Sequence, residues 1–181
     1  MTSTEAGNLD ASSVANIVSA NFKAYNINFR NTYGAGSQAV AVTANGDKQG
    51  FYGCGFYGYQ DTLYAKNGKQ YYSNCYMEGA VDYIFGNAAA WFGECTVASN
   101  GGGAITATSR EDPADPSRYV FDHSTVCPLS PKLIVSSFSP NLTNGRLPLR
   151  LVRVSLGRCS LGGRGEYYLA SCSRILCSQT L

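Results

Sequence analysis

Short runs of alternating apolar and polar or small residues recur along the first 126 residues of the chain. Three runs align at offsets of 21 and then 20 residues: Phe51, Cys54, Phe56 and Gly58; Tyr72, Cys75, Met77 and Gly79; Phe92, Cys95, Val97 and Ser99. The last three positions of each run are two residues apart, which is the side-chain period of a strand with one buried face. The pattern predicts short strands that repeat along the chain.

A repeat of roughly 20 to 30 residues built from short strands indicates a solenoid. Leucine-rich repeats are excluded, because Leu9 and Leu63 are the only leucines in the first 126 residues. A single-stranded parallel β-helix fits better, with each coil stacked about 4.8 Å from the next. In this all-β fold, Cys54, Cys75 and Cys95 are expected to form an interior ladder of buried thiols, and a disulfide between the first two stays open.

Two aspartates, Asp61 and Asp82, are 21 residues apart and therefore share one position of the coil. A lone aspartate most often caps a turn. Two carboxylates stacked one coil apart cannot both ionise at low cost, so the pKa of one should rise. One group would then serve as an acid and the other as a base or nucleophile.

Composition divides the chain into two parts. The 181 residues are 44% hydrophobic, 12% aromatic and 14% charged, which is typical of one folded domain or slightly more. Residues 1–126 carry 7 basic and 11 acidic residues, whereas residues 127–181 carry 7 basic residues and a single acid, Glu166. We therefore expect a partial β-helix over residues 1–126 and a basic tail, rich in Ser, Leu, Arg and Cys, over residues 127–181.

Strand periodicity stops after about residue 126, and the tail is expected to be irregular. A separate basic element, a loop-rich cap and a shifted reading frame in the coding sequence compete as explanations. We favour the shifted frame because the break is abrupt. The basic charge is compatible with nucleic acid or an acidic polysaccharide, but no interleaving of aromatic and basic residues supports nucleic acid.

The sequence supports neither a metal-binding site nor a membrane-spanning segment. The tail cysteines Cys127, Cys159, Cys172 and Cys177 match no zinc spacing, and His123 is the only histidine. No apolar run approaches the roughly 20 residues that cross a bilayer. The polar N-terminus does not resemble a signal peptide.

Two longer segments carry a resemblance to a known family. Residues 55–64 (GFYGYQDTLY) and 79–87 (GAVDYIFGN) resemble two signatures of the pectin methylesterases, at the spacing found in that family. Residues 38–41 (QAVA) and 108–113 (TSREDP) resemble two further motifs. The similarity covers about residues 20–126. It implies a right-handed parallel β-helix, in agreement with the repeat, and a chain that lacks the family's first coils and secretion signal.

The resemblance also implies a reaction and the residues that perform it. Members hydrolyse methyl esters of galacturonate units in pectin, which releases methanol. By motif position Asp82 is the nucleophile that forms an acyl-enzyme, and Asp61 is first the general acid and then the general base. Gln60 and Gln38 would donate hydrogen bonds to the oxyanion. The implied enzyme is monomeric and extracellular and needs no metal or cofactor.

Substrate-binding residues follow less directly. Tyr59 and Tyr83 are candidates to stack on sugar rings, with packing between coils as the alternative for each. The family places an arginine and a tryptophan in a Leu-Gly-Arg-Pro-Trp motif, where this chain has residues 156–160, LGRCS. Arg158 is the candidate for that arginine, although its neighbours differ, and Trp91 is expected to pack within a coil.

These departures keep a second function open, that of a non-catalytic polysaccharide-binding or vestigial β-helix. A polysaccharide lyase of the same fold is more remote, because the glutamine–aspartate signature argues against it. The expected polymer in either of the first two cases is methyl-esterified homogalacturonan or its product.

Overall fold

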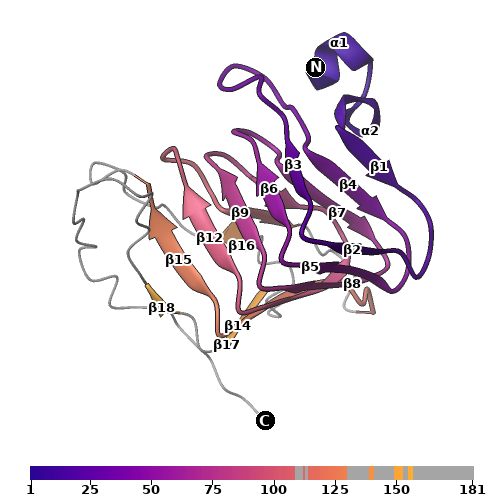
Figure 1. The fold of residues 1–181 in the computed structure, drawn as a ribbon, viewed down its shortest axis with the longest axis vertical. Coiled ribbons are helices and arrows are strands. Elements are labelled where there is room, and N and C mark those ends of the chain that lie inside the picture. The colour runs from indigo at the N-terminus through magenta and orange to yellow at the C-terminus, as the bar shows by residue number, and fades with distance from the viewer. Residues whose placement is uncertain (109–111, 113, 130–138, 141–148, 153–154, 157–181) are drawn as a thin grey trace.

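The computed structural model describes residues 1–108, 112, 114–129, 139–140, 149–152 and 155–156. Within these ranges the strands form three six-stranded parallel sheets, and each coil contributes one strand to each sheet in turn (Figure 1). The chain is therefore a parallel β-helix, as the sequence predicts.

Sheet A contains β1 (Ala15–Ile17), β4 (Val42–Asn45), β7 (Leu63–Asn67), β10 (Ile84–Phe85), β13 (Thr106–Thr108) and β16 (Ser139–Pro140). Sheet B contains β2 (Lys23–Tyr25), β5 (Gln49–Tyr52), β8 (Lys69–Ser73), β11 (Ala89–Gly93), β14 (Arg118–Asp122) and β17 (Leu149–Val152). Sheet C contains β3 (Asn28–Arg30), β6 (Gly55–Tyr57), β9 (Tyr76–Gly79), β12 (Thr96–Ser99), β15 (Thr125–Pro128) and β18 (Ser155–Leu156).

The strand register confirms the repeat found in the sequence. Phe51 pairs with Tyr72, and Tyr72 pairs with Phe92, at offsets of 21 and 20 residues. The next partner in this column is Phe121, so the following coil is longer and places its extra residues between β12 and β14. The predicted period therefore holds for the middle coils and lengthens after them.

Stacked aromatic rings fill the interior along this column. Ring centroids lie 5.0 Å apart between Phe51 and Tyr72, 4.7 Å between Tyr72 and Phe92, and 4.5 Å between Phe92 and Phe121. All four side chains are fully buried. The Tyr72 hydroxyl donates a hydrogen bond to Oε1 of Gln70 at 2.7 Å, so its polar end is satisfied inside the core.

The cysteine ladder is present and its members are thiols. Cys54, Cys75 and Cys95 are buried and free, as predicted. The Cys75 thiol contacts the carbonyl of Phe51 at 3.3 Å. Ser124 takes the next position in register, and its hydroxyl donates to the carbonyl of Phe92 at 3.1 Å. Polar atoms of the ladder therefore reach backbone carbonyls inside the core.

Strand pairing continues past residue 126, which corrects the prediction that regular coils end there. In the tail, β16, β17 and β18 pair in parallel with β13, β14 and β15. Cys127 on β15 is buried and disulfide-bonded. Within the described residues, these short tail strands therefore extend the same three sheets. Arg158, Cys159, Cys172 and Cys177 lie outside the described residues.

Two short helices, α1 (Ser3–Ala6) and α2 (Leu9–Ser12), lie beside β1 at one end of the coils (Figure 1). Thr2 and Glu5 form a capping box on α1, with Oε2 of Glu5 accepting from the Thr2 amide at 2.8 Å. Asn31 ties this region to the coils, because its side-chain amide donates to the carbonyls of Met1 and Val40, each at 3.1 Å. Neither of these helices, the only ones in the described ranges, has the length and apolar character of a membrane span.

We expect Phe92→Ala to lower the free energy of unfolding by about 3–5 kcal/mol, because it removes a fully buried ring that contacts rings on both sides. Urea unfolding measures the loss. Trp91→Ala on the same strand is the matched control, since that ring is 41% exposed and its removal should cost less than about 1 kcal/mol. Equal losses of unfolding free energy in the two variants would contradict the idea that the buried column of stacked rings stabilises the fold more than an exposed ring does.

Candidate active site

The two aspartates occupy the corner at which the chain leaves sheet C and enters sheet A. Asp61 lies between β6 and β7, and Asp82 lies between β9 and β10. The residues before them, Gln60 and Val81, form a parallel bridge, and the Asp61 amide donates to the carbonyl of Val81 at 3.1 Å. The structure thus brings Asp61 and Asp82 to equivalent places on adjacent coils, about 4.8 Å apart along the stack.

Both aspartates have left-handed backbone conformations, with φ of 62° at Asp61 and 49° at Asp82. Aspartate tolerates this region better than most residues, although a non-glycine residue still incurs some strain there. The next strands begin two residues later, at Leu63 and Ile84. The conformation therefore turns the chain sharply and presents both carboxylates at the same corner.

Glycines at the end of sheet C make room for the residues that follow each aspartate. A Cβ at Gly79 would lie 2.2 Å from the Cβ of Tyr83, and a Cβ at Gly58 would lie 2.6 Å from Oγ1 of Thr62. Thr62 is fully buried and donates to the carbonyl of Glu78 at 3.0 Å. Close packing of these two side chains fixes the backbone beside both carboxylates.

Of the two alternatives for Tyr83, its burial favours packing between coils over stacking on a sugar ring. Its side chain is fully buried, and its hydroxyl lies 2.9 Å from the hydroxyl of Ser99. Tyr59 is different, because it remains partly exposed at the same corner, and a Cβ at Gly101 would lie 3.1 Å from its hydroxyl. Tyr59 therefore stays a candidate for substrate contact, while Tyr83 positions the backbone next to Asp82.

The two carboxyl groups have unlike surroundings. Asp61 is only 3% exposed, and its burial, together with the charge of Asp82, raises the pKa of its carboxyl from 3.8 to about 7. A hydrogen bond from the Gln38 side chain opposes this rise. Burial also raises the pKa of Asp82, which is more exposed than Asp61. Asp61 is therefore suited to hold a proton while Asp82 is ionised.

Two glutamines complete the corner. The Ala39 amide donates to the carbonyl of Gln60 at 3.2 Å, so Gln38 enters the site from the coil before Asp61. The backbone carbonyl of Gln38 accepts from the Ser3 amide at 2.9 Å, which links the site to α1. In the described part of the chain, the Gln60 side chain has no hydrogen-bond partner. Its amide donors are therefore open to a bound molecule.

An aromatic pair that the sequence reasoning missed lies beside the carboxylates. Tyr64 and Phe85 follow Asp61 and Asp82 by three residues each and pair in register on sheet A. Their rings stack with centroids 4.3 Å apart and planes 11° apart, and both are partly exposed. The signal was available, because the two aromatics repeat at the same spacing as the aspartates.

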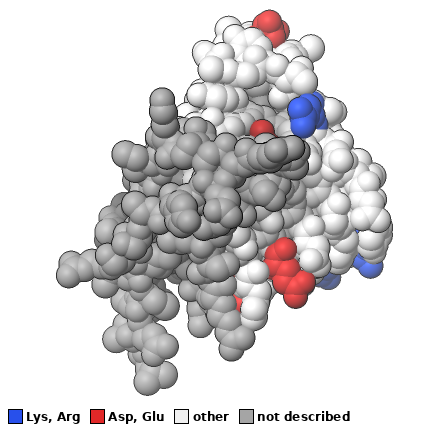
Figure 2. All heavy atoms as spheres, turned by 60° about the vertical axis from the view of Figure 1, so that its left-hand side comes forward, with Lys and Arg blue, Asp and Glu red and all other residues white. Residues whose placement is uncertain are grey.

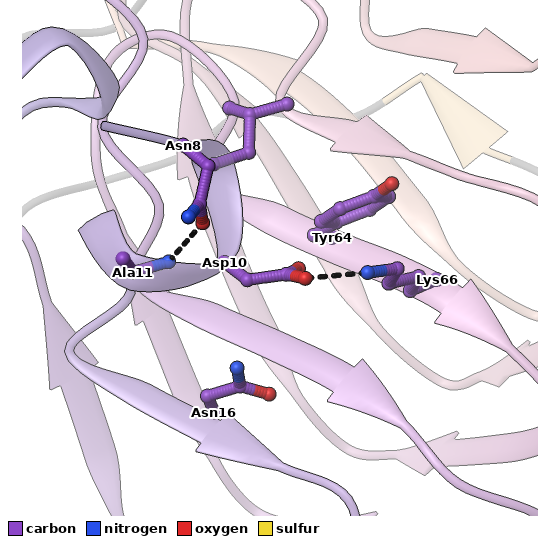
Figure 3. Close-up of a pocket in the computed structure, with 7 residues that line it drawn as sticks. Asn8, Asp10, Ala11, Asn16, Tyr64 and Lys66 are labelled. Atoms are coloured by element: carbon purple, nitrogen blue, oxygen red, sulfur yellow. Dashed lines mark hydrogen bonds and ion pairs between the residues drawn. The ribbon is translucent and has the colours of Figure 1, made fainter. Parts of the chain in front are cut away.

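A pocket of about 480 Å³ lies between α2 and sheet A, lined by Asn8, Leu9, Asp10, Ala11, Asn16, Tyr64 and Lys66 (Figure 3). Tyr64 belongs to this pocket and to the aromatic pair, so the pocket extends the site toward the N-terminal helices. Lys66 and Asp10 face each other across it, 2.5 Å apart (Figure 3). The site thus offers an aromatic surface beside the carboxylates and a polar pocket further along.

Figure 2 shows the side of the molecule that lies at the left of Figure 1. On the described part of this surface, charged side chains are sparse and scattered. Within the described ranges, neither Asp61 nor Asp82 forms an ion pair. No group of three His, Cys, Asp or Glu side chains in those ranges could hold a metal ion. The chemistry of the described site therefore rests on carboxyl, amide and aromatic groups. Arg158 and most of residues 108–113 fall outside the description.

Comparison with known proteins gives one family. The family model described as Pectinesterase matches residues 3–142. Pectinesterase A of Emericella nidulans is 62% identical over 126 residues, which cover 70% of this chain and 39% of that protein. A probable pectinesterase A of Aspergillus niger is 59% identical over 126 residues, covering 70% of this chain and 38% of its own length. The chain thus spans about two fifths of the curated relatives that it matches.

Solved structures agree with the sequence matches. The pectin methylesterase of Aspergillus niger superposes with a TM-score of 0.71 and 46% identity, covering 90% of this chain and 57% of that one. The carrot pectin methylesterase has a TM-score of 0.60 and 36% identity, covering 65% of this chain and 39% of its own. A pectin methylesterase in complex with a hexasaccharide has a TM-score of 0.61 and 30% identity, with coverages of 68% and 43%.

We expect the stability of the protein to depend on pH through Asp61. The folded protein binds the Asp61 proton more tightly than the unfolded chain, because the pKa is raised from 3.8 to about 7. This contribution is complete below about pH 4 and is lost as pH rises to about 7. Asp61→Asn removes it, so the variant should gain stability relative to the parent between about pH 4 and pH 8, by up to roughly 4 kcal/mol.

Urea unfolding of both proteins across this pH range measures that difference. Glu94→Gln, the same chemical change at an exposed corner, is the control and should show no such trend. A stability difference that is constant with pH would contradict a raised Asp61 pKa.

Proposed function

Because the chain belongs to the pectinesterase family, we propose that it hydrolyses methyl esters of galacturonate units in pectin to methanol and free carboxylate. The observation that carries this proposal is the aspartate pair, one coil apart and with unlike surroundings. Family membership also supports an extracellular location, with methyl-esterified homogalacturonan as the partner of a monomeric enzyme.

In the proposed first half-reaction, ionised Asp82 attacks the ester carbonyl carbon and a tetrahedral oxyanion forms. The free amide donors of Gln60 are suited to stabilise that oxyanion; losing one such donor typically costs about 3 kcal/mol. A hydrogen bond from Gln38 lowers the pKa of the Asp61 carboxyl, so we assign Gln38 first to holding that carboxyl and then to assisting Gln60. Asp61 gives its proton to the methoxy oxygen, and methanol departs. The acyl-enzyme that remains is an anhydride between Asp82 and the galacturonate.

In the second half-reaction, Asp61 acts as a general base instead of a general acid. Its carboxylate now takes a proton from water, and the resulting hydroxide attacks the carbonyl carbon of the anhydride. Cleavage of the anhydride releases the galacturonic acid carboxyl group, which loses its proton to solvent, and regenerates ionised Asp82. Asp61 ends protonated, as it began. A pKa near 7 suits this group, because it must both donate and accept a proton in one cycle.

Substrate binding is proposed for the surface next to the carboxylates. Tyr64 and Phe85 present stacked, partly exposed rings on the outer face of sheet A, where sugar rings could lie against them. Tyr59, which is partly exposed at the same corner, is proposed as a further contact.

A non-catalytic polysaccharide-binding protein is the second candidate. It is favoured by residues 156–160, LGRCS, in which the proline and tryptophan of the family motif are absent. This candidate keeps the aromatic surface and assigns no turnover to Asp61 and Asp82. Methanol release separates the two functions.

We expect the full chain to release methanol from highly methyl-esterified pectin, and Asp82→Asn to reduce the rate at least about 1,000-fold because it removes the nucleophile. Asp61→Asn should also reduce the rate, since no acid then protonates the leaving group. Glu94→Gln, an exposed carboxylate on the opposite side of sheet C, should leave the rate unchanged.

Equal methanol release by Asp82→Asn would overturn the proposed nucleophile. Binding of polygalacturonate without any methanol release would favour the non-catalytic candidate. An unsaturated product that absorbs in the ultraviolet would indicate a lyase.

We expect Tyr64→Ala to raise KM for pectin about three- to tenfold with a smaller effect on kcat, because it removes a stacking surface worth about 0.5–1.5 kcal/mol. Tyr64→Phe retains the ring and should behave as the parent protein. Steady-state methanol release over a range of pectin concentrations measures both constants. An unchanged KM in Tyr64→Ala would exclude this ring from the binding surface.

A further inference from the structure

The outer face of sheet B carries a groove that the proposed reaction does not use. Its volume is about 270 Å³, and its lining comes from three successive coils: Lys23, Lys48, Gln49, Gly50, Tyr52, Lys69, Gln70 and Tyr71. These residues belong to β2, β5 and β8 or immediately precede β5, and the three strands lie side by side (Figure 1). The aspartate pair instead lies on the corner between sheets C and A.

Three lysines line this groove. Lys23, Lys48 and Lys69 are all exposed, and none forms an ion pair within the described ranges. Gln49 pairs with Gln70, so Lys48 and Lys69 occupy adjacent coils. The nearby acid is Asp47, whose Oδ1 accepts from the Lys69 backbone amide at 3.1 Å. The groove therefore keeps an excess of positive charge that a bound anion would balance.

Aromatic rings stand beside these cations. Tyr71 is 42% exposed, and its ring centroid lies 6.0 Å from that of Tyr52. Tyr52 also stacks on Tyr25 at 4.9 Å. A Cβ at Gly50 would lie 2.9 Å from the Tyr52 ring, so this ring lies over the glycine and a larger residue there would displace it. The result is a surface with ring faces and ammonium groups side by side.

We propose that this groove is a second, non-catalytic binding site for de-esterified galacturonan. Its carboxylates complement the three lysines, and the apolar faces of its sugar rings suit the tyrosines. A methyl-esterified chain lacks these charges and should bind less well. The identity of the polymer rests on the proposed function, since that reaction would produce this anionic chain.

Nucleic acid has the same combination of negative charge and stacking surface, but the structure favours it less. The cations of the groove are lysines only, whereas arginine is the usual residue for bidentate phosphate recognition. Residues 1–126 also carry 11 acidic and 7 basic residues, which disfavours a densely charged polyanion at long range.

The site has a natural probe, because Trp91 is the only tryptophan of the chain and pairs in register with Tyr71. It is 41% exposed on the same face. We would titrate the Asp82→Asn protein with unmethylated and with fully methyl-esterified oligogalacturonate and follow Trp91 fluorescence. This variant excludes turnover, so the binding result does not depend on methanol release.

We expect the unmethylated oligomer to change Trp91 fluorescence and to bind more weakly as salt is raised. Lys48→Gln combined with Lys69→Gln should raise its Kd about tenfold, because two exposed charge interactions are lost. Lys48→Arg combined with Lys69→Arg keeps the charges and should bind as the parent does. Arg30→Gln removes one charge from sheet C and serves as the off-site control.

Equal affinity of the glutamine and arginine double variants would overturn the proposal, as would equal affinity for the methyl-esterified oligomer. Tighter binding of a single-stranded DNA oligonucleotide of the same net charge would assign the groove to nucleic acid instead. If the parent protein releases no methanol but Asp82→Asn still binds the unmethylated oligomer, the proposed function alone is contradicted. If the parent protein releases methanol but Asp82→Asn does not bind the oligomer, only this binding site is contradicted.

Discussion

Parallel pairing of each strand with the strand one coil away is the interaction on which the rest of the structure depends. This pairing fixes a register, and a shift of one residue would exchange every inward side chain for an outward one. Inside, the register places Tyr72 between Phe51 and Phe92 at centroid distances of 5.0 and 4.7 Å. At the corner between sheets C and A, the same register aligns Asp61 with Asp82. Stability and chemistry therefore share one geometric cause.

Burial of Asp61 follows from this geometry and has an energetic cost. A buried carboxylate is destabilising unless it is paired, and no described cation pairs with it. The protein meets this cost by keeping the proton, which is why the pKa is raised to about 7. Close packing of the buried Thr62 and Tyr83 against Gly58 and Gly79 holds the backbone around this unfavourable group in place. A strained, left-handed backbone at both aspartates adds to the same local cost.

The sequence was sufficient for features that depend on the repeat alone. The coil period, the thiol ladder and the alignment of Asp61 with Asp82 all follow from residues at fixed offsets. It failed where packing between different strands decides the outcome. Tyr83 is buried because Gly79, on the preceding strand, leaves space for its ring. The tail strands were missed because their pairing depends on partners in β13, β14 and β15 and leaves no alternation in the tail itself.

The outward-facing columns extend the same reasoning to the surface. A coil that repeats at 21 residues aligns whatever it carries outside as well as inside, so Lys48 and Lys69 stand on adjacent coils for the same reason that the aspartates do. On the proposed function, hydrolysis creates a negative charge next to two carboxyl groups, which disfavours retention of the product there. The lysine face attracts that same charge. Release of the de-esterified product from the aspartate pair and its binding at the lysines of sheet B would then follow from charge alone. Neither step would need a change in the shape of the coils.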